Sequence, residues 1–276
     1  MASSTPLILL PPSEGKTSGG EGAPWSPGSM AVDLDAERAR TAAALRRAMR
    51  ANQASRSKLL GVKGDALAAA TAANHELTDA PTMPAIERYS GVLYTALDAG
   101  SLGARARSRL DASVLIVSGL WGLVAPSDPI PDYKLKMGAS LPPLGKLSTW
   151  WRPAIDAAFE RVLSGRSGGT PVWNLLPQEH DAAWSGMAWS GLAHAGVADR
   201  PVYRVRFLEP GRDGQLVAVA HWNKFLKGAL VRFLVEHPGA GPEELAQWEH
   251  PSGFVLDPEM TVESVDGVQL HLVKHA

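Results

Sequence analysis

Short apolar runs that end at proline or glycine recur along the chain and predict buried strands. Three of them are Pro6–Leu10, Val114–Val117 and Pro171–Leu176, each too short for an ordinary helix. Turn residues separate further pairs of apolar segments, which predict paired strands later in the chain. These segments are Tyr203–Leu208, Leu216–His221, Gly253–Leu256 and Val268–Val273, the last two around an Asp266-Gly267 turn.

Stretches with apolar residues at helical spacing separate the strands and predict helices. The predicted helices are Asp35–Asn52, Ile86–Leu97, Ala104–Leu110, Lys146–Leu163, Trp222–Glu236 and Pro242–Trp248. Between residues 55 and 77, a tight Gly61–Gly64 turn predicts two helices joined as a hairpin. No internal repeat, low-complexity segment or linker interrupts this order, and 276 residues suffice for one large domain or two small ones.

The highest density of turn-forming residues follows the strand Val114–Val117. Within Ser113–Gly138, glycines and three prolines favour a rigid loop directly after the strand. Such loops at strand ends of open α/β sheets converge on a crevice where ligands bind. This loop presents Asp132, Tyr133, Lys134 and Lys136. A phenol and two ammonium groups on a rigid loop suit an anionic ligand. The alternative is a solvated connection whose lysines only maintain solubility.

Polar side chains also follow the first and third predicted strands. The first strand continues into PPSEGKTSGGEG, a Gly-rich loop that lacks the glycine and lysine spacing of a P-loop. Its candidate ligand-binding side chains are Ser13, Glu14 and Lys16, and those after the third strand are Asn174 and Glu179. We expect these groups to lie near the central loop, although the first loop is also compatible with an ordinary exposed connection.

The helix Trp222–Glu236 has a cationic stripe formed by Lys224, Lys227 and Arg232. Such a stripe is usually a solvated face. Gly228 lies in the same helix, where glycine costs about 1 kcal/mol relative to alanine. A glycine at this position indicates the close approach of another backbone or of a ligand.

Charge is unevenly distributed, although the formal net charge is only −1. Ala36–Lys63 has eight basic residues and one acid, whereas the segment from Phe233 to the end has eight acids and one lysine. This segregation predicts either a positive surface or salt bridges between segments. A glycine hairpin beside basic residues also presents backbone amides suited to nucleic-acid phosphates, the alternative being a hairpin that only packs.

Several chemistries are not supported by the sequence. The absence of cysteine excludes disulfides and thiolate catalysis. No HExxH metal motif and no GxSxG hydrolase elbow occurs. Glu179-His180 is the one pair that suggests metal ligands. We therefore expect no metal and no cofactor. The run Leu7–Leu10 lacks the features of a signal peptide, and no apolar stretch approaches membrane-spanning length. We therefore expect a cytoplasmic location and no membrane partner.

Four motifs occur in the order PPSEGK, SGLWGLVAPSDPIPDYKLKMG, NLLPQEH and KFLKGALVRFL. Together they resemble the YaaA family of peroxide-stress proteins over nearly the whole chain. The central motif is the most specific, and Lys16 takes the place of the lysine in the family's first motif. Lys134 stands where an arginine is frequent.

The resemblance implies one α/β (α+β) domain spanning residues 1–276, with helices around a mixed sheet. It also implies a helix–hairpin–helix element at about residues 55–77, non-specific binding to double-stranded DNA, and a role in limiting iron-linked oxidative damage. The residues expected to contact DNA are Arg46, Arg47, Arg50, Lys58 and Lys63, with the backbone at Gly61 and Gly64.

The alternative interpretation is an enzyme that acts on a phosphorylated, nucleotide-like or nucleobase-like substrate. Its candidate catalytic residues are Lys16, Tyr133, Lys136, Glu179 and Lys227. Glu179 or Tyr133 would transfer a proton, and a lysine would stabilise developing negative charge. Its candidate ligand-binding residues are Ser13, Glu14, Lys134, Asn174, Lys224 and Arg232. The two interpretations are compatible, because enzymes that process bases also bind DNA.

Overall fold

A mixed sheet of eight strands forms the centre of the computed structural model, which describes residues 5–184, 200–211, 214–219, 223–264 and 267–274. Five strands are parallel and lie in the order β3-β1-β8-β9-β12. Their bounds are β1 Leu7–Leu10, β3 Val114–Ser118, β8 Val172–Asn174, β9 Val202–Pro210 and β12 Gly267–Lys274. The antiparallel strands are β4 Gly122–Val124, β10 Leu216–Ala218 and β11 Phe254–Ser264.

The first predicted strand occupies the middle of this sheet. All four residues of β1 are buried, and Ile8 lies beside Val114 of β3 and Trp173 of β8. A parallel strand covered on both faces needs apolar side chains at every position, so the uninterrupted run LILL fits this place. The buried apolar residues form one cluster that extends from Leu7 to Leu272. The mixed α/β fold expected from the family resemblance is confirmed.

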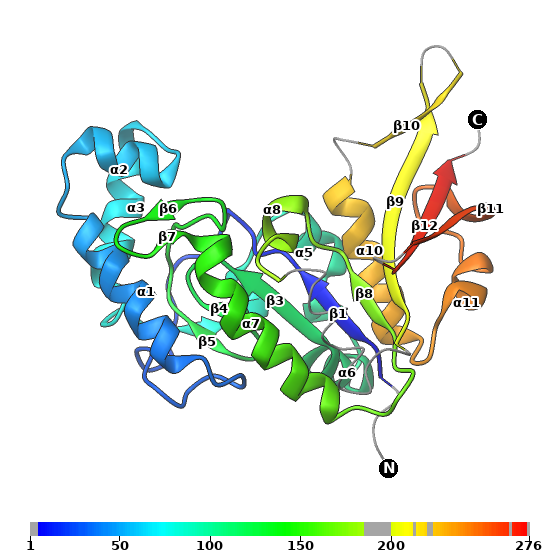
Figure 1. Ribbon diagram of the computed structural model, residues 1–276, viewed down its shortest axis with the longest axis horizontal. Helices are drawn as coiled ribbons and strands as arrows, with labels where there is room; N and C mark the ends of the chain where they lie inside the picture. Colours follow the sequence, from blue (N-terminus) through cyan, green and yellow to red (C-terminus); the bar gives the residue numbers. More distant parts are fainter. Residues whose placement is uncertain (1–4, 185–199, 212–213, 220–222, 265–266, 275–276) are drawn as a thin grey trace.

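Helices cover both faces of the sheet. In Figure 1, α7 crosses the near face, whereas α5, α6 and α10 lie behind the strands. The helices α1–α3 gather at one end, beside the β6–β7 hairpin. The helix bounds are α1 Asp35–Ala48, α2 Gln53–Leu60, α3 Gly64–Glu76, α4 Ala85–Arg88, α5 Val92–Leu97, α6 Ala104–Ser113, α7 Leu147–Ser164, α8 Gln178–Asp181, α10 Asn223–Glu236 and α11 Pro242–Ala246.

Short paired segments complete the fold. They are β2 Met83–Pro84 with β5 Pro129–Ile130, β6 Ser140–Leu141 with β7 Gly145–Lys146, and a 3-10 turn at Ala99–Ser101. Among the described residues, no helix combines the length and the apolar character that crossing a membrane requires. Part of the predicted strand at Leu216–His221, the predicted helix start at Trp222 and the turn residue Asp266 lie outside the described residues.

The prediction of one helix over Ile86–Leu97 is wrong, because the chain forms α4 and α5 with an extended break between them. At the break, Tyr89 pairs with Lys16 and the Ser90 amide donates to the Gly15 carbonyl. A tertiary pairing with the loop after β1 therefore overrides the helical pattern. The break brings this segment beside the loop that contains Lys16.

Gly228 allows α10 to pack directly on the backbone of α5. A Cβ atom at this position would lie 2.2 Å from the Leu93 carbonyl oxygen and 2.7 Å from the Ala96 Cβ. Of the two explanations offered by the sequence, close approach of another backbone is the one found. This contact positions α10, and with it Lys224, relative to α5.

Candidate functional site

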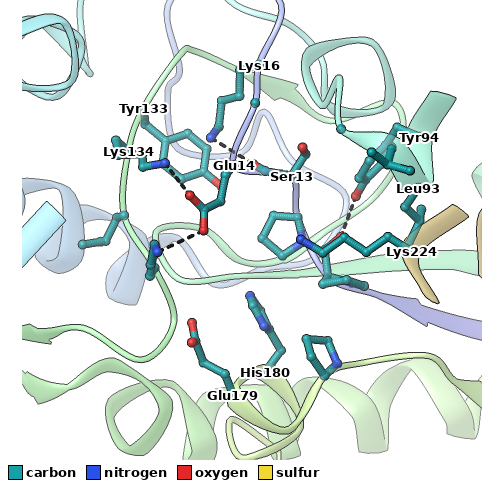
Figure 2. A pocket seen from close by; sticks show the side chains of 18 residues that line it. Ser13, Glu14, Lys16, Leu93, Tyr94, Tyr133, Lys134, Glu179, His180 and Lys224 are labelled. Atoms are coloured by element: carbon teal, nitrogen blue, oxygen red, sulfur yellow. Dashed lines mark hydrogen bonds and ion pairs between the residues drawn. The ribbon is translucent and has the colours of Figure 1, made fainter. Parts of the chain in front are cut away.

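A cavity of about 440 Å³ lies at the carboxyl ends of the parallel strands (Figure 2). The strand order places β3 on one side of β1 and β8 on the other, so the chain reverses its progress across the sheet at this point. In open α/β sheets, ligands bind in the crevice that such a reversal creates. The segment Pro11–Lys16 after β1 and the segment after β8 both line the cavity.

The cavity brings together eight of the side chains expected at a ligand or catalytic site. These residues are Ser13, Glu14, Lys16, Tyr133, Lys134, Lys136, Glu179 and Lys224. They come from the loops after β1 and β8, from the loop that precedes β6, and from α10. Their roles in catalysis or ligand binding stay predictions.

Three other expected site residues are not among those that line the cavity. Asn174 donates to an oxygen of Asp181 at 2.8 Å. Lys227 donates to the Leu175 carbonyl at 3.0 Å. Arg232 forms ion pairs with two acidic side chains and donates to backbone carbonyls near the end of α5. These contacts support the walls of the cavity, since they tie α8, α10 and α5 to their neighbours.

Glu14 links two of the cavity lysines. One of its oxygens lies 2.8 Å from the Lys134 Nζ and the other lies 3.0 Å from the Lys136 Nζ. The hydrogen bond from Lys134 is the largest cause that lowers the pKa of Glu14, to about 2. The lining residues comprise four lysines and two glutamates, so the cavity is cationic in total.

Lys16 is partly buried and lies against the ring of Tyr133. Its Nζ donates to the Ser13 carbonyl at 3.2 Å and lies 4.2 Å from the centre of the Tyr133 ring. Desolvation is the main cause that lowers the pKa of Lys16 to about 8, opposed by the charge of Asp132 and reinforced by that of Lys134. At pH 7 about a tenth of the Lys16 amine is therefore uncharged, and this fraction rises as pH approaches 8.

The Tyr133 hydroxyl belongs to a buried chain of hydroxyl groups. It lies 2.8 Å from the Tyr89 hydroxyl and 2.8 Å from the Ser118 Oγ. Burial raises the pKa of Tyr133 to about 12. This phenol is consequently protonated at neutral pH, so it can donate or relay a hydrogen bond but supplies no ready base.

Glu179 and His180 form the wall opposite Lys16 and Tyr133 (Figure 2). An oxygen of Glu179 accepts the Gly138 amide at 3.0 Å, which joins this wall to the central loop. Desolvation, with a smaller contribution from Lys224, lowers the pKa of His180 to about 4. Its buried Nδ1 has no hydrogen-bond partner among the described residues. The His180 imidazole that lines the cavity is thus neutral at pH 7.

Two buried residues that hold the loops in place were not identified from the sequence. The Asn74 side chain accepts the Lys134 amide and donates to the Lys134 carbonyl, both at 2.9 Å. The Arg88 guanidinium donates to the carbonyl groups of Thr17 and Gly19. Both partners are distant in sequence, so no local pattern could have indicated these contacts. Within the described ranges, no three histidine or carboxylate side chains lie close enough to bind a metal ion.

The predicted helix pair α2–α3 is present, and its turn lies beside the cavity. Gly61 ends α2 with a φ of 69°, a backbone conformation that favours glycine. A Cβ atom on Gly61 would lie 3.8 Å from the Lys136 Nζ. Whether these helices act as a helix–hairpin–helix motif stays a prediction.

Exposed cations surround this turn. Arg47, Arg50, Lys58 and Lys63 are exposed on or next to α1–α3, and we call these four residues the basic end. Arg46 is partly buried and lies 3.8 Å from Asp79. Arg38 contributes nothing to this surface, because it is fully buried and donates to the carbonyls of Trp121, Val32 and Leu123.

Comparison with known proteins agrees with the motifs. The model of a family described as "Peroxide stress protein YaaA" matches residues 7–260. The chain belongs to this family. A UPF0246 protein of Streptomyces coelicolor is 36% identical over 258 residues, which cover 92% of each chain. A UPF0246 protein of Corynebacterium glutamicum is 33% identical over 261 residues, covering 91% of this chain and 94% of that protein.

The YaaA-family motifs identified in the sequence meet in the fold. The segments PPSEGK, DYKLKMG, LPQEH and KFLKG each supply at least one residue to the lining of the cavity. They are separated by up to about two hundred residues in the chain, and the strand order together with the packing of α10 on α5 brings them together. All four motifs that resemble the YaaA family therefore contribute to the lining of this one cavity.

Proposed function

We propose that this YaaA-family protein binds double-stranded DNA without sequence preference and thereby limits iron-linked oxidative damage during peroxide stress. The observation that supports DNA binding most directly is the basic end. None of its four cations has a carboxylate within ion-pair distance in the described part of the chain. Exposed cations that have no carboxylate partner can replace the counterions of DNA phosphates.

The turn between α2 and α3 adds a second element of phosphate recognition. The N-terminus of α3 follows Lys63 directly, and Gly64 begins the helix. Backbone amides at a helix N-terminus favour negative charge, and the absence of side chains at Gly61 and Gly64 leaves room for a phosphate to approach. Such contacts position the duplex without reading its sequence.

Fluorescence anisotropy with two unrelated duplexes, at several salt concentrations, tests this proposal. Affinity should fall by roughly 0.9 log units per decade of salt for each phosphate contact. Combined Arg47→Ala, Arg50→Ala and Lys58→Ala substitution should weaken both duplexes alike. The exposed Arg105, on α6, provides a matched control in Arg105→Ala.

A salt-insensitive isotherm, or no binding at low salt, contradicts the proposal. Protection is tested separately by exposing plasmid DNA to ferrous iron and hydrogen peroxide with the wild-type protein or the triple variant. The wild type should reduce strand breaks and the triple variant should not. Equal protection by both proteins would show that protection from damage does not depend on DNA binding by the basic end.

A second candidate function is binding or conversion of an anionic small molecule in the cavity. Its support is the cationic lining, to which Lys16, Lys134, Lys136 and Lys224 contribute. Phosphate or nucleotides should raise the melting temperature of the wild type, but not that of a Lys136→Ala, Lys224→Ala double variant. Lys146→Ala is the control, because Lys146 is exposed and does not line the cavity. An equal shift in the double variant would place the anion elsewhere.

A further inference from the structure

Lys16 differs from the neighbouring lysines because no carboxylate lies within ion-pair distance of its amine in the described residues. Glu14 holds Lys134 and Lys136 at 2.8 and 3.0 Å, whereas the Lys16 Nζ has a hydrogen bond to the Ser13 carbonyl. Figure 2 shows the Lys16 side chain reaching toward Tyr133 at the edge of the cavity. Its amine is thus placed beside the cavity without a salt bridge to hold it.

The surroundings of Lys16 favour an uncharged amine in a defined position. Backbone pairing with Tyr89 fixes the main chain, and the ring centres of Tyr133 and Tyr89 lie 4.2 and 5.7 Å from the Nζ. The charged groups that act on it are Asp132, Glu14, Lys134 and Arg88, whose effects oppose one another. Desolvation therefore dominates and lowers the pKa to about 8. A desolvated lysine of this kind is the usual source of a nucleophilic amine in proteins.

We propose that Lys16 forms a Schiff base with the carbonyl carbon of an anionic aldehyde bound in the cavity. This inference rests on the second candidate function, the binding of an anionic molecule. The uncharged Nζ attacks the carbonyl carbon, a C–N bond forms, and the π electrons of the C=O bond move to oxygen. One amine proton and one solvent proton leave with that oxygen as water, so that the product is a protonated imine. No oxidant, reductant or other co-reactant is needed.

The cavity selects an aldehyde that bears phosphate. Lys134, Lys136 and Lys224 line it beside Lys16, and ammonium groups bind phosphate oxygens as point charges. Two sources share this chemistry. One is the ring-opened sugar of an abasic site in duplex DNA, which the basic end would bring to the cavity through the adjacent Gly61 turn. The other is a free sugar phosphate.

Reductive trapping tests the inference on the full chain. The protein is incubated at pH 7.5 with sodium cyanoborohydride and one of two probes, a duplex with a single abasic site or glyceraldehyde 3-phosphate. Intact mass and peptide mapping then locate the adduct. We expect labelling of Lys16 to exceed that of the exposed Lys146 at least about tenfold, because desolvation lowers the pKa of Lys16 to about 8 and the cavity holds the probe beside its amine.

Two variants provide matched controls. Lys16→Arg retains the positive charge but not the nucleophilic amine, so the specific adduct should disappear. Lys227 also has a pKa lowered to about 8 but does not line the cavity, so Lys227→Arg should be labelled like the wild type. If a variant does not fold, the position of the adduct in the wild-type protein still tests the inference.

The two probes separate this inference from DNA binding. Trapping with glyceraldehyde 3-phosphate alone supports a free substrate, even if the protein does not bind duplex DNA. Trapping with the abasic duplex alone supports a DNA lesion as the substrate. The inference is overturned if neither probe is trapped, if the adduct maps evenly over exposed lysines, or if Lys16→Arg retains the specific adduct.

Discussion

Replacing Gly228 by alanine should destabilise the protein even though alanine is the better helix former. The substitution gains about 1 kcal/mol of helix propensity. Against this, the new Cβ would lie 2.2 Å from the Leu93 carbonyl oxygen and 2.7 Å from the Ala96 Cβ. Overpacking of this kind costs about 1–3 kcal/mol. Because the closest atom belongs to a backbone, a side-chain rotation cannot relieve the overlap.

The expected net effect of Gly228→Ala is therefore a loss of about 2 kcal/mol in the free energy of unfolding, at the upper end of the overpacking range. Urea unfolding should show a lower midpoint with an unchanged slope. The melting temperature should fall by about 4–8 °C for a chain of this size. Gly100→Ala is the control, since a Cβ atom there would meet nothing within 4 Å.

The same substitution should also weaken anion binding. The overlap forces α10 away from α5, and these helices supply Lys224, Leu93 and Tyr94 to the cavity lining. A Gly228→Ala variant that is as stable as the wild type, or more stable, would show that α10 and α5 do not pack at this distance. The explanation of Gly228 would then be wrong.

Three further substitutions test other contacts. Arg38→Ala should cost about 3–5 kcal/mol in urea unfolding, because it leaves buried carbonyls without donors, whereas exposed Arg40→Ala should change stability by less than about 0.5 kcal/mol. The lowered pKa of Glu14 contributes stability above the unfolded value of 4.5 that is lost as pH falls toward about 2, so thermal melts of Glu14→Gln and wild type should converge over this range. That contribution is under about 1 kcal/mol, since Glu14 is exposed. Tyr133→Phe should cost about 1–2 kcal/mol by leaving Tyr89 with one partner fewer, and unchanged melting would contradict the hydroxyl chain.

Much of the site was predictable because its residues follow local rules. Apolar runs predicted β1, β3 and β8, and polar groups that follow them in the chain line one cavity, although β4 and β5 interrupt the single loop expected after β3. The strand-end rule succeeded because the carboxyl ends of parallel strands share one edge of a sheet. Asn174 ends β8 but does not line the cavity, because it donates to Asp181. Lys227, predicted from the cationic stripe of α10, donates to the Leu175 carbonyl and is also absent from the lining. Proximity to a strand end does not decide which way a side chain points.

Other features depended on partners far away in the chain. Arg38 belongs to a basic segment that predicted either a positive surface or salt bridges between segments, yet carbonyls more than eighty residues away hold it in the core. Asn74 is an unremarkable helical residue until its side chain meets the Lys134 backbone. The break between α4 and α5 likewise exists because residues 89–90 pair with the loop after β1.

The sequence by itself determined most strands of the main sheet, most helices, the cationic motifs and the family, because apolar periodicity, turn residues and motif order are local properties of the chain. Only the tertiary structure decided which cations are exposed, paired or desolvated. Lys134, Lys136 and Lys16 lie on loops of similar composition, but Glu14 pairs with the first two and the tyrosine rings shield the third. Desolvation and pairing depend on atoms brought together from distant segments, and these interactions distinguish an ordinary ammonium group from a reactive amine.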